Sequence, residues 1–267
     1  MSYRLIVTDL DDTLLDEDSE ISERNHKAVE KAMEKGIYFT LATGRMVQST
    51  SRYARKLKVE LPIITYHGAL VRCLQEEKTY YYRPLEAWLA RKVIEEAQKR
   101  NHHVNLYLED RLFVKEHNRF TRFYETFSSV EVEPVGDLVE FLENRGEVPT
   151  KITIIDEEEA MEEVEQHLKA LYPHRLNLML SRPLFLEITH PQATKGRALK
   201  ILADNLGVRR EEILAFGDSF NDIDMLEYAG LGVAVENARP AVKKVADLIS
   251  PPHHEDGVAQ ILEQYVL

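Results

Sequence analysis

Short apolar runs alternate with longer amphipathic runs towards both ends of this 267-residue chain. Residues 4–8 form a strand-sized apolar run, a helical spacing of apolar residues follows Ser22, and residues 37–42 and 62–66 repeat the strand pattern. Strands that alternate with helices are typical of an α/β fold, because each helix carries the chain back to the start of the next parallel strand. The sequence therefore predicts a doubly wound, mostly parallel, Rossmann-like sheet.

The middle of the chain has a different pattern. A helix predicted over residues 85–100 is followed by short strands and a helix that carries several aromatic residues. The earlier alternation returns towards the C-terminus. We therefore predict a discontinuous α/β core formed by residues 1–82 and 188–267, and an inserted α+β cap domain formed by residues 83–187.

Composition excludes several classes of protein. The chain has 34 Lys+Arg and 46 Asp+Glu, and its net charge of −12 argues against non-specific binding to nucleic acid or anionic lipid. Cys73 is the only cysteine, which excludes an intrachain disulfide and fits a reducing compartment. The apolar runs are shorter than the roughly 18 residues of a membrane span, and the first strand leaves no room for a signal peptide. We expect a soluble, cytoplasmic protein without membrane or nucleic-acid partners; the oligomeric state is not predicted.

Three predicted strands of the core end in polar residues that have useful chemistry. These ends are Asp9-Leu10-Asp11, Thr43-Gly44-Arg45 and Gly217-Asp218. In an open parallel sheet, ligands bind at the carboxyl ends of the strands, so we expect the three ends to meet at one site. Carboxylates crowded there repel one another unless a cation lies between them. Because the expected donors are all oxygen atoms, the sequence indicates a hard cation, with Mg²⁺ favoured.

Groups that suit an anion are expected beside this metal site. Thr43 offers a hydroxyl, Gly44 offers a backbone N–H at the start of a helix, and Lys195 offers a positive charge. An acidic metal site beside a small cationic anion site is typical of phosphoryl transfer. The expected partner is a small molecule that carries a phosphate ester.

Four segments of the chain resemble the motifs of the haloacid dehalogenase-like (HAD) phosphatase superfamily. They are DLDDTLL at residues 9–15, ATGR at 42–45, TKG at 194–196 and GDSFND at 217–222. They occur in the family's order, each at the expected end of a strand or helix. Their forms are similar to those of the Cof-type branch, which carries its cap domain between the second and third motifs, where the insertion lies here.

The resemblance implies a role for each of these side chains. Asp9 would attack phosphorus and form an aspartyl-phosphate. Asp11 would protonate the leaving oxygen and then activate water. Asp9, the backbone carbonyl of Asp11 and Asp218 would hold Mg²⁺, with Asp222 supporting them from outside the coordination sphere. The phosphoryl oxygens would be bound by the N–H of Leu10 and by Thr43, Gly44, Lys195 and Asn221.

Two positions depart from the common form of the branch. Asp12 stands where many relatives have Gly and adds negative charge near the metal, and His67 stands where the branch commonly has Asn. For His67 the sequence leaves two interpretations, a contact with substrate or a structural role at the end of a strand. Arg45 likewise either reaches the substrate or has a surface or helix-capping role.

Each segment alone also has a structural interpretation. Asp and Thr favour turns, a lone lysine is normally solvated, and Asp218 and Asn221 would suit the cap of a helix starting near Asp222. Because these interpretations would all have to hold independently, the functional one is favoured.

The leading functional hypothesis is a Mg²⁺-dependent phosphatase that hydrolyses small phosphorylated metabolites, such as sugar phosphates or similar monoesters. A phosphomutase or phosphotransferase of the same fold stays open, since the aspartyl-phosphate would then pass to an acceptor sugar instead of water. A receiver-like signalling module that accepts phosphate is less favoured, because its acceptor Asp lies further along the chain. The cap is expected to set specificity, and helical spacing favours the cap core for Phe120, Phe123, Tyr124 and Phe127.

Overall fold

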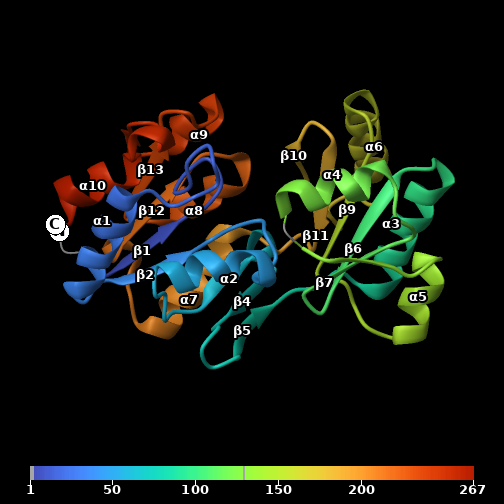
Figure 1. Cartoon of the computed structure of the whole chain (residues 1–267), viewed down its shortest axis with the longest axis horizontal. Coiled ribbons are helices and arrows are strands. Elements are labelled where there is room, and N and C mark those ends of the chain that lie inside the picture. The colour runs from blue at the N-terminus through green and yellow to red at the C-terminus, as the bar shows by residue number, and fades with distance from the viewer. Residues whose placement is uncertain (1–2, 129) are drawn as a thin grey trace. The chain divides into compact units, whose positions relative to one another are not determined.

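The computed structural model describes residues 3–128 and 130–267, apart from the side chain of Phe127. The chain forms two compact units, and each is described by itself (Figure 1). The first unit comprises Met1–Arg45, Thr50–Tyr82 and Thr194–Leu267, and the second comprises Met46–Ser49 and Arg83–Ala193. No helix in the described ranges is both long and apolar enough to span a lipid bilayer.

A five-stranded sheet, all of whose strand pairs are parallel, organises the first unit. In spatial order its strands are β14 (Leu248–Ser250), β13 (Leu231–Val235), β12 (Ile213–Gly217), β1 (Leu5–Thr8) and β2 (Tyr38–Leu41). Leu5 of β1 pairs with Ile213 on one side and with Tyr38 on the other. The predicted α/β fold with a mostly parallel sheet is confirmed, and β1 lies inside the sheet, between β12 and β2.

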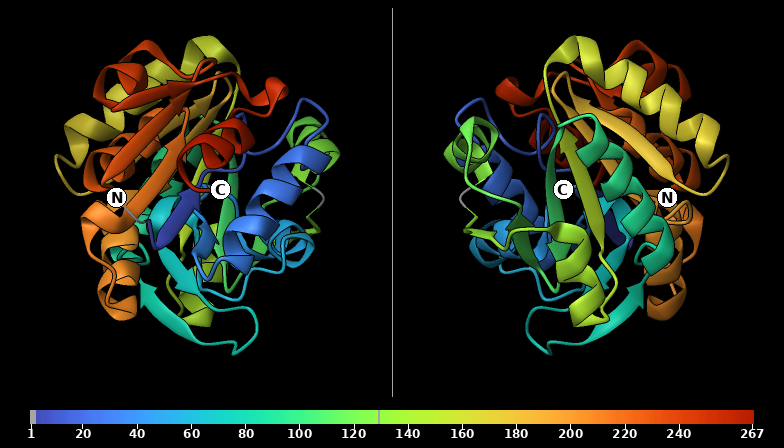
Figure 2. Two further views of the ribbon diagram at one scale, coloured as in Figure 1. Left: turned by 90° about the vertical axis from the view of Figure 1, so that its left-hand side faces the viewer. Right: turned by 90° about the vertical axis from the view of Figure 1, so that its right-hand side faces the viewer.

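Helices cover both faces of this sheet because alternate strand residues point to opposite faces. Leu5 and Val7 pack in one cluster with apolar residues of α7 (Lys195–Leu206), α8 (Ile223–Tyr228) and α9 (Pro240–Val245). In the same unit, α1 (Glu23–Glu34) and α10 (Gly257–Tyr265) pack side by side (Figure 2). The hydroxyls of Ser22 and Thr194 accept backbone N–H groups at the starts of α1 and α7, which fixes where these helices begin.

A second, antiparallel sheet joins this unit after α2 (Val47–Lys56). Its strands are β3 (Ile63–Thr65), β4 (Leu70–Arg72) and β5 (Thr79–Tyr82), and a short 3₁₀ turn, η1 (Tyr66–Gly68), connects the first two. Ala42 bridges Ile64 in parallel, so β3 lies beside the end of β2. The predicted strand over residues 62–66 is therefore shorter than expected and ends in a tight turn.

The second unit contains a six-stranded sheet in which only the β7–β8 pair is parallel. In spatial order its strands are β10 (Asn177–Arg182), β11 (Phe185–Thr189), β9 (Lys151–Ile155), β6 (His103–Leu108), β7 (Arg111–Val114) and β8 (Val132–Pro134). Its helices are α3 (Ala87–Lys99), α4 (Arg119–Ser128), α5 (Leu138–Arg145) and α6 (Glu158–Leu171). Residues 188–193 cluster with this unit, because β11 continues beyond residue 187 in the same sheet.

The aromatic helix α4 corresponds only in part to the cap core expected from its spacing. Tyr124 is half-buried, and its hydroxyl accepts a hydrogen bond from the Tyr107 hydroxyl at 2.8 Å. Phe123 is 43% exposed, so its assignment to the core is wrong. The spacing predicted the helix but not how far around its surface the packing extends. The side chain of Phe127 lies outside the described residues.

Candidate active site

Three carboxylates meet at the carboxyl ends of β1 and β12. Asp9 directly follows β1 and Asp218 directly follows β12, and the N–H of Asp9 donates to the Phe216 carbonyl at 3.0 Å across the two strands. One carboxylate oxygen from each of Asp9, Asp218 and Asp222 lies within 4.8 Å of the others. All three side chains are buried. The parallel pairing of β1 with β12 thus brings together groups that are far apart in the sequence.

Lys195 is a fully buried lysine that bridges two of these carboxylates. Its Nζ donates to Oδ1 of Asp9 at 2.6 Å and to Oδ1 of Asp222 at 2.7 Å. Burial would lower the pKa of Lys195, but the negative charges of Asp222 and Asp9 raise it above its ordinary value. The solvated-lysine interpretation is therefore excluded. A Cβ on Gly196 would lie 2.4 Å from the Asp224 carbonyl, so α7 and α8 approach closely where this lysine enters the site.

Hydrogen bonds hold Asp222 and Asp218 in place. Oδ2 of Asp222 accepts the N–H groups of Asp218 at 3.1 Å and Ser219 at 3.0 Å, and its Oδ1 accepts from Lys195. Both Asp222 oxygens are thus engaged with protein donors, which suits a supporting role better than metal ligation. Asp218 accepts the Thr13 hydroxyl at 3.3 Å and the Ser219 hydroxyl at 2.7 Å. Sequence reasoning gave Thr13 and Ser219 no role, although both stand inside the family-like segments.

The charges of this group fit a divalent cation. Burial raises the pKa of Asp9 well above its usual range, Lys195 opposes that shift, and Asp222 and Asp218 add to it. Burial and the Asp222 charge raise the pKa of Asp218 to about 6. When ionised, the three carboxylates exceed the single lysine by two negative charges. A hard divalent ion with oxygen ligands is the group that compensates such an excess.

The predicted anion-binding residues lie next to this acidic group. The N–H of Ala42 donates to the Thr8 carbonyl at 2.9 Å, which places Thr43 beside Asp9 at the ends of neighbouring strands. The Thr43 hydroxyl accepts the N–H of Arg45 at 3.1 Å, so it shapes the turn into α2. Leu10 is buried, and its carbonyl anchors the turn that follows β1.

Arg45 forms an ion pair with Asp11. Its Nε donates to Oδ2 of Asp11 at 2.8 Å, and a second guanidinium nitrogen donates to Oδ1. Its third nitrogen donates to the Tyr53 hydroxyl at 3.3 Å. Burial opposes the charge of Arg45, but the hydrogen bond and the charge of Asp11 raise its pKa. Arg45 therefore orients Asp11, which the sequence did not predict, and the Asp11 side chain lies outside the three-carboxylate group.

His67 lies between two predicted phosphate-binding residues. Its Nδ1 is 3.0 Å from Nδ2 of Asn221, which belongs to the 3₁₀ turn η3 (Phe220–Asp222). A Cβ on Gly44 would lie 2.2 Å from Cε1 of His67, so only glycine fits beneath the ring. Gly44 and Asn221 therefore both lie against the imidazole of His67.

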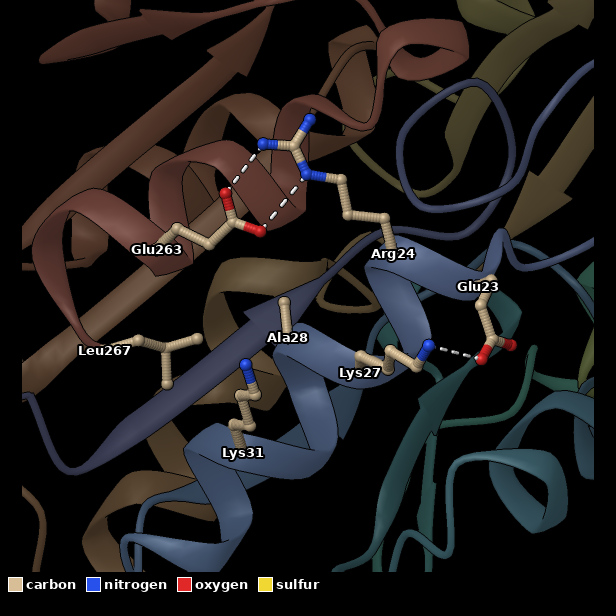
Figure 3. A pocket seen from close by; sticks show the side chains of 7 residues that line it. All are labelled: Glu23, Arg24, Lys27, Ala28, Lys31, Glu263 and Leu267. Carbon is tan, nitrogen blue, oxygen red and sulfur yellow. Dashed lines mark hydrogen bonds and ion pairs between the residues drawn. The ribbon is translucent and has the colours of Figure 1, made fainter.

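A groove of about 380 Å³ lies elsewhere in the first unit, between α1 and α10 (Figure 3). Arg24 pairs there with Glu263 at 2.6 Å, and Lys27 pairs with Glu23 at 2.9 Å. None of the predicted site residues lines it, so the groove takes no part in the site. Its lining residues are Glu23, Arg24, Lys27, Ala28, Lys31, Glu263 and Leu267.

Comparison with known proteins finds the same architecture and related sequences. The family model of haloacid dehalogenase-like hydrolases matches residues 6–262. The 5-amino-6-(5-phospho-D-ribitylamino)uracil phosphatase YitU of Bacillus subtilis is 32% identical over 98% of this chain and 97% of its own length. A haloacid dehalogenase-like hydrolase from Bacteroides thetaiotaomicron superposes with a TM-score of 0.90 at 29% identity, covering 98% of this chain and 99% of that one. The HAD subclass IIB sugar phosphatase BT4131 superposes with a TM-score of 0.86 at 25% identity, covering 98% of each chain.

Proposed function

Because this chain belongs to the haloacid dehalogenase-like hydrolase family, in its Cof-type branch of phosphatases, we propose that it hydrolyses small phosphorylated metabolites through an aspartyl-phosphate, with Mg²⁺ as cofactor. The observation that carries the proposal is the buried group at the ends of β1 and β12. There, Asp9, Asp218 and Asp222 exceed Lys195 by two negative charges when ionised. Asp9, Asp218 and the backbone carbonyl of Asp11 would hold the ion. When bound, Mg²⁺ would neutralise charge on the carboxylates and on the phosphoryl oxygens.

In the first half-reaction, Asp9 is the nucleophile. Lys195 binds its Oδ1, which leaves Oδ2 to attack phosphorus. The bond from phosphorus to the ester oxygen breaks as the bond to Asp9 forms, and Asp11 gives its proton to the leaving oxygen. The phosphoryl oxygens would be held by the N–H of Leu10 and by Thr43, Gly44, Lys195 and Asn221.

In the second half-reaction, water attacks the aspartyl-phosphate. Asp11, now ionised, accepts the proton of that water, and phosphate and the Asp9 carboxylate are released. The contact with Arg45 suits this step, because a guanidinium orients an ionised carboxylate with two hydrogen bonds. Asp222 would hold Lys195 and the backbone of Asp218 in register throughout.

The names of two relatives support a substrate class. YitU is named as a phosphatase of a phosphorylated ribitylamino-uracil, and BT4131 is named as a sugar phosphatase. We infer that this chain acts on a phosphate monoester of a sugar or of a similar hydroxyl-rich metabolite. The family match across residues 6–262 favours an enzyme of this kind over a receiver-like module. Added acceptor sugars and product analysis would detect phosphotransfer in place of hydrolysis.

The experiment that tests the mechanism compares Asp9→Asn and Asp11→Asn on two substrates. Asp9→Asn should abolish turnover of both, because an amide cannot replace the attacking carboxylate. Asp11→Asn should retain much of the activity on p-nitrophenyl phosphate, whose leaving group needs no proton. On a sugar phosphate it should lose about 10²- to 10⁴-fold, the usual contribution of general acid–base catalysis.

The readouts are steady-state rates and the mass of protein quenched during turnover. Asp11→Asn should accumulate phosphoprotein with p-nitrophenyl phosphate, because breakdown of the intermediate lacks its base. Asp18→Asn, which changes an exposed acidic residue further along the same loop, is the matched control and should behave as wild type. Substantial turnover by pure Asp9→Asn would refute the nucleophile. An equal loss by Asp11→Asn on both substrates, without trapped phosphoprotein, would refute its acid–base role.

A further inference from the structure

The turn η1 holds two non-glycine residues, Tyr66 and His67, in a left-handed backbone conformation. Tyr66, His67 and Gly68 have φ values of 52°, 56° and 96°, so three successive residues are left-handed and two of them carry large side chains. Each such non-glycine residue costs on the order of 1–2 kcal/mol. Strain of this kind persists only where surrounding contacts fix it, and it gathers at functional sites.

Contacts on both sides of η1 fix this conformation. The N–H of Tyr66 donates to the Arg45 carbonyl at 2.9 Å, and the N–H of His67 donates to the Thr43 carbonyl at 3.0 Å. A Cβ on Gly68 would lie 2.2 Å from the Thr194 carbonyl oxygen. The turn therefore touches two segments that carry predicted phosphate-binding groups, the loop after β2 and the start of α7.

The His67 side chain reaches a third segment. It is 4% exposed, and its Nδ1 lies 3.0 Å from Nδ2 of Asn221. With the Asn221 amide nitrogen as the donor, Nδ1 is the acceptor, and a neutral ring then carries its proton on Nε2; this tautomer is assigned from the hydrogen-bond geometry. Oδ1 of Asn221 is buried and has no hydrogen-bond partner among the described residues. The bond to His67 is thus what fixes the Asn221 amide within the part of the chain that the structure describes.

We propose that His67 is a positioning residue that orients Asn221 for the phosphoryl group. The inference rests on the proposed function, in which Asn221 binds a phosphoryl oxygen. One N–H of its amide donates to Nδ1 of His67, and this bond directs the second N–H to the anion. The ring also covers Gly44, so one side chain sets the spacing between two phosphate-binding groups.

This role differs from that of a residue that only ends a strand. A strand-ending residue needs the left-handed backbone but no acceptor at Nδ1. Asn keeps both properties, since Asn tolerates positive φ and its side-chain oxygen can occupy the position of Nδ1. Leu has no acceptor and tolerates positive φ less well than Asn, so the two variants, His67→Asn and His67→Leu, are compared with the Asn221→Ala background, in which loss of the acceptor has no further effect but backbone strain still does.

The test measures inorganic phosphate binding by calorimetry in the presence of Mg²⁺, and KM and kcat with p-nitrophenyl phosphate, for wild type and variants. His67→Leu should weaken phosphate binding and raise KM by roughly 10- to 100-fold, the range for losing a hydrogen bond to a charged group, with kcat changed less. His67→Asn should restore both values to within a few fold of wild type. In an Asn221→Ala background, His67→Leu should have no further effect, because its action passes through that amide.

Lys58→Leu is the matched control, since Lys58 also has a left-handed backbone, with φ of 55°, and does not belong to the predicted site. It should bind phosphate as wild type does. Wild-type phosphate affinity in His67→Leu would overturn the proposal. An equal loss of affinity in His67→Leu and His67→Asn would also overturn it, and so would a further loss of affinity when His67→Leu is added to Asn221→Ala. A wild-type protein that binds phosphate but hydrolyses no monoester would overturn the proposed function and leave the His67 comparison valid.

Discussion

Replacing Lys195 by Met would remove one buried positive charge and retain most of the side-chain volume. Nζ of Lys195 lies 2.6 Å from Asp9 and 2.7 Å from Asp222, and the lysine is fully buried. Breaking a buried ion pair by removing one partner costs about 3–5 kcal/mol, because the other partner remains buried without compensation. In a unit of this size, that loss lowers the melting temperature by roughly 6–20 °C.

The loss should depend on pH. Asp9 has a folded-state pKa already raised by burial, and without the opposing charge of Lys195 it rises further. A carboxyl whose folded pKa exceeds its unfolded pKa holds more protons when folded, so stability falls as pH rises between those two values. The raised pKa of Lys195 adds stability that is fully present throughout pH 5–8, below its ordinary value of 10.5. Lys195→Met should therefore be less stable than wild type at both pH values, and the difference should be larger near pH 8 than near pH 5.

Urea unfolding in EDTA at pH 5 and pH 8 would measure this difference from the shift of the midpoint at unchanged slope. Lys200→Met is the matched control, because Lys200 lies on the same helix but is exposed, and its ion pair with Asp204, at 3.0 Å, is on the surface. It should unfold as wild type does at both pH values. A loss below about 1 kcal/mol at pH 8, or an equal loss at both pH values, would refute the reasoning, since a buried counter-charge requires both.

Removing metal with EDTA should stop hydrolysis, and adding Mg²⁺ should restore it. Mg²⁺ should also raise the melting temperature far more at pH 8 than at pH 5, because protons compete with the metal below the Asp218 pKa of about 6. Equal stabilisation at both pH values would contradict this. Asp12→Gly should raise the free energy of unfolding, measured by urea unfolding, by up to about 1 kcal/mol. Asp12 is exposed with φ of 57°, and glycine adopts that conformation without strain. A lower urea midpoint would show that the Asp side chain has a role there. Lys151→Met should destabilise the second unit by about 3–5 kcal/mol, because it leaves the Glu187 carboxylate, 2.9 Å from Nζ, without its counter-charge. Arg91→Met, on the surface of that unit, is its control, and equal midpoints for the two variants would argue against a buried pair.

The site residues that stand at the end of a strand or at the start of a helix could be predicted from the sequence. Asp9 and Asp218 follow apolar strands, and parallel strands share one edge for their carboxyl ends, so their meeting follows from topology. Lys195 begins α7 as expected, because Thr194 caps that helix. The side-chain partners could not be predicted. Whether Arg45 reaches Asp11 depends on the turns after two strands and on the rotamers of both residues, which no sequence spacing specifies.

Short elements and strained backbone also escaped prediction. Strands β4 and β8 have three residues each, too few to show an alternation of apolar and polar side chains. The left-handed conformation of Tyr66 and His67 could not be anticipated, because it is tertiary contacts with the Arg45 and Thr43 carbonyls that fix it. The insertion was visible in the sequence as a change of pattern, but β11 continues past residue 187 because its pairing with β9 and β10 decides where it ends.

The position of β1 has a consequence for how the protein is made. Its pairing with β2 is available once the chain has reached Leu41, whereas its pairing with β12 must wait until Gly217 has emerged. At about 5–20 residues per second, one edge of an apolar strand stays unpaired for roughly 10–40 seconds during synthesis. An unpaired strand edge readily pairs with other chains. The aggregation hazard of this protein therefore lies in its first strand, during the interval in which the ribosome is still producing the second unit.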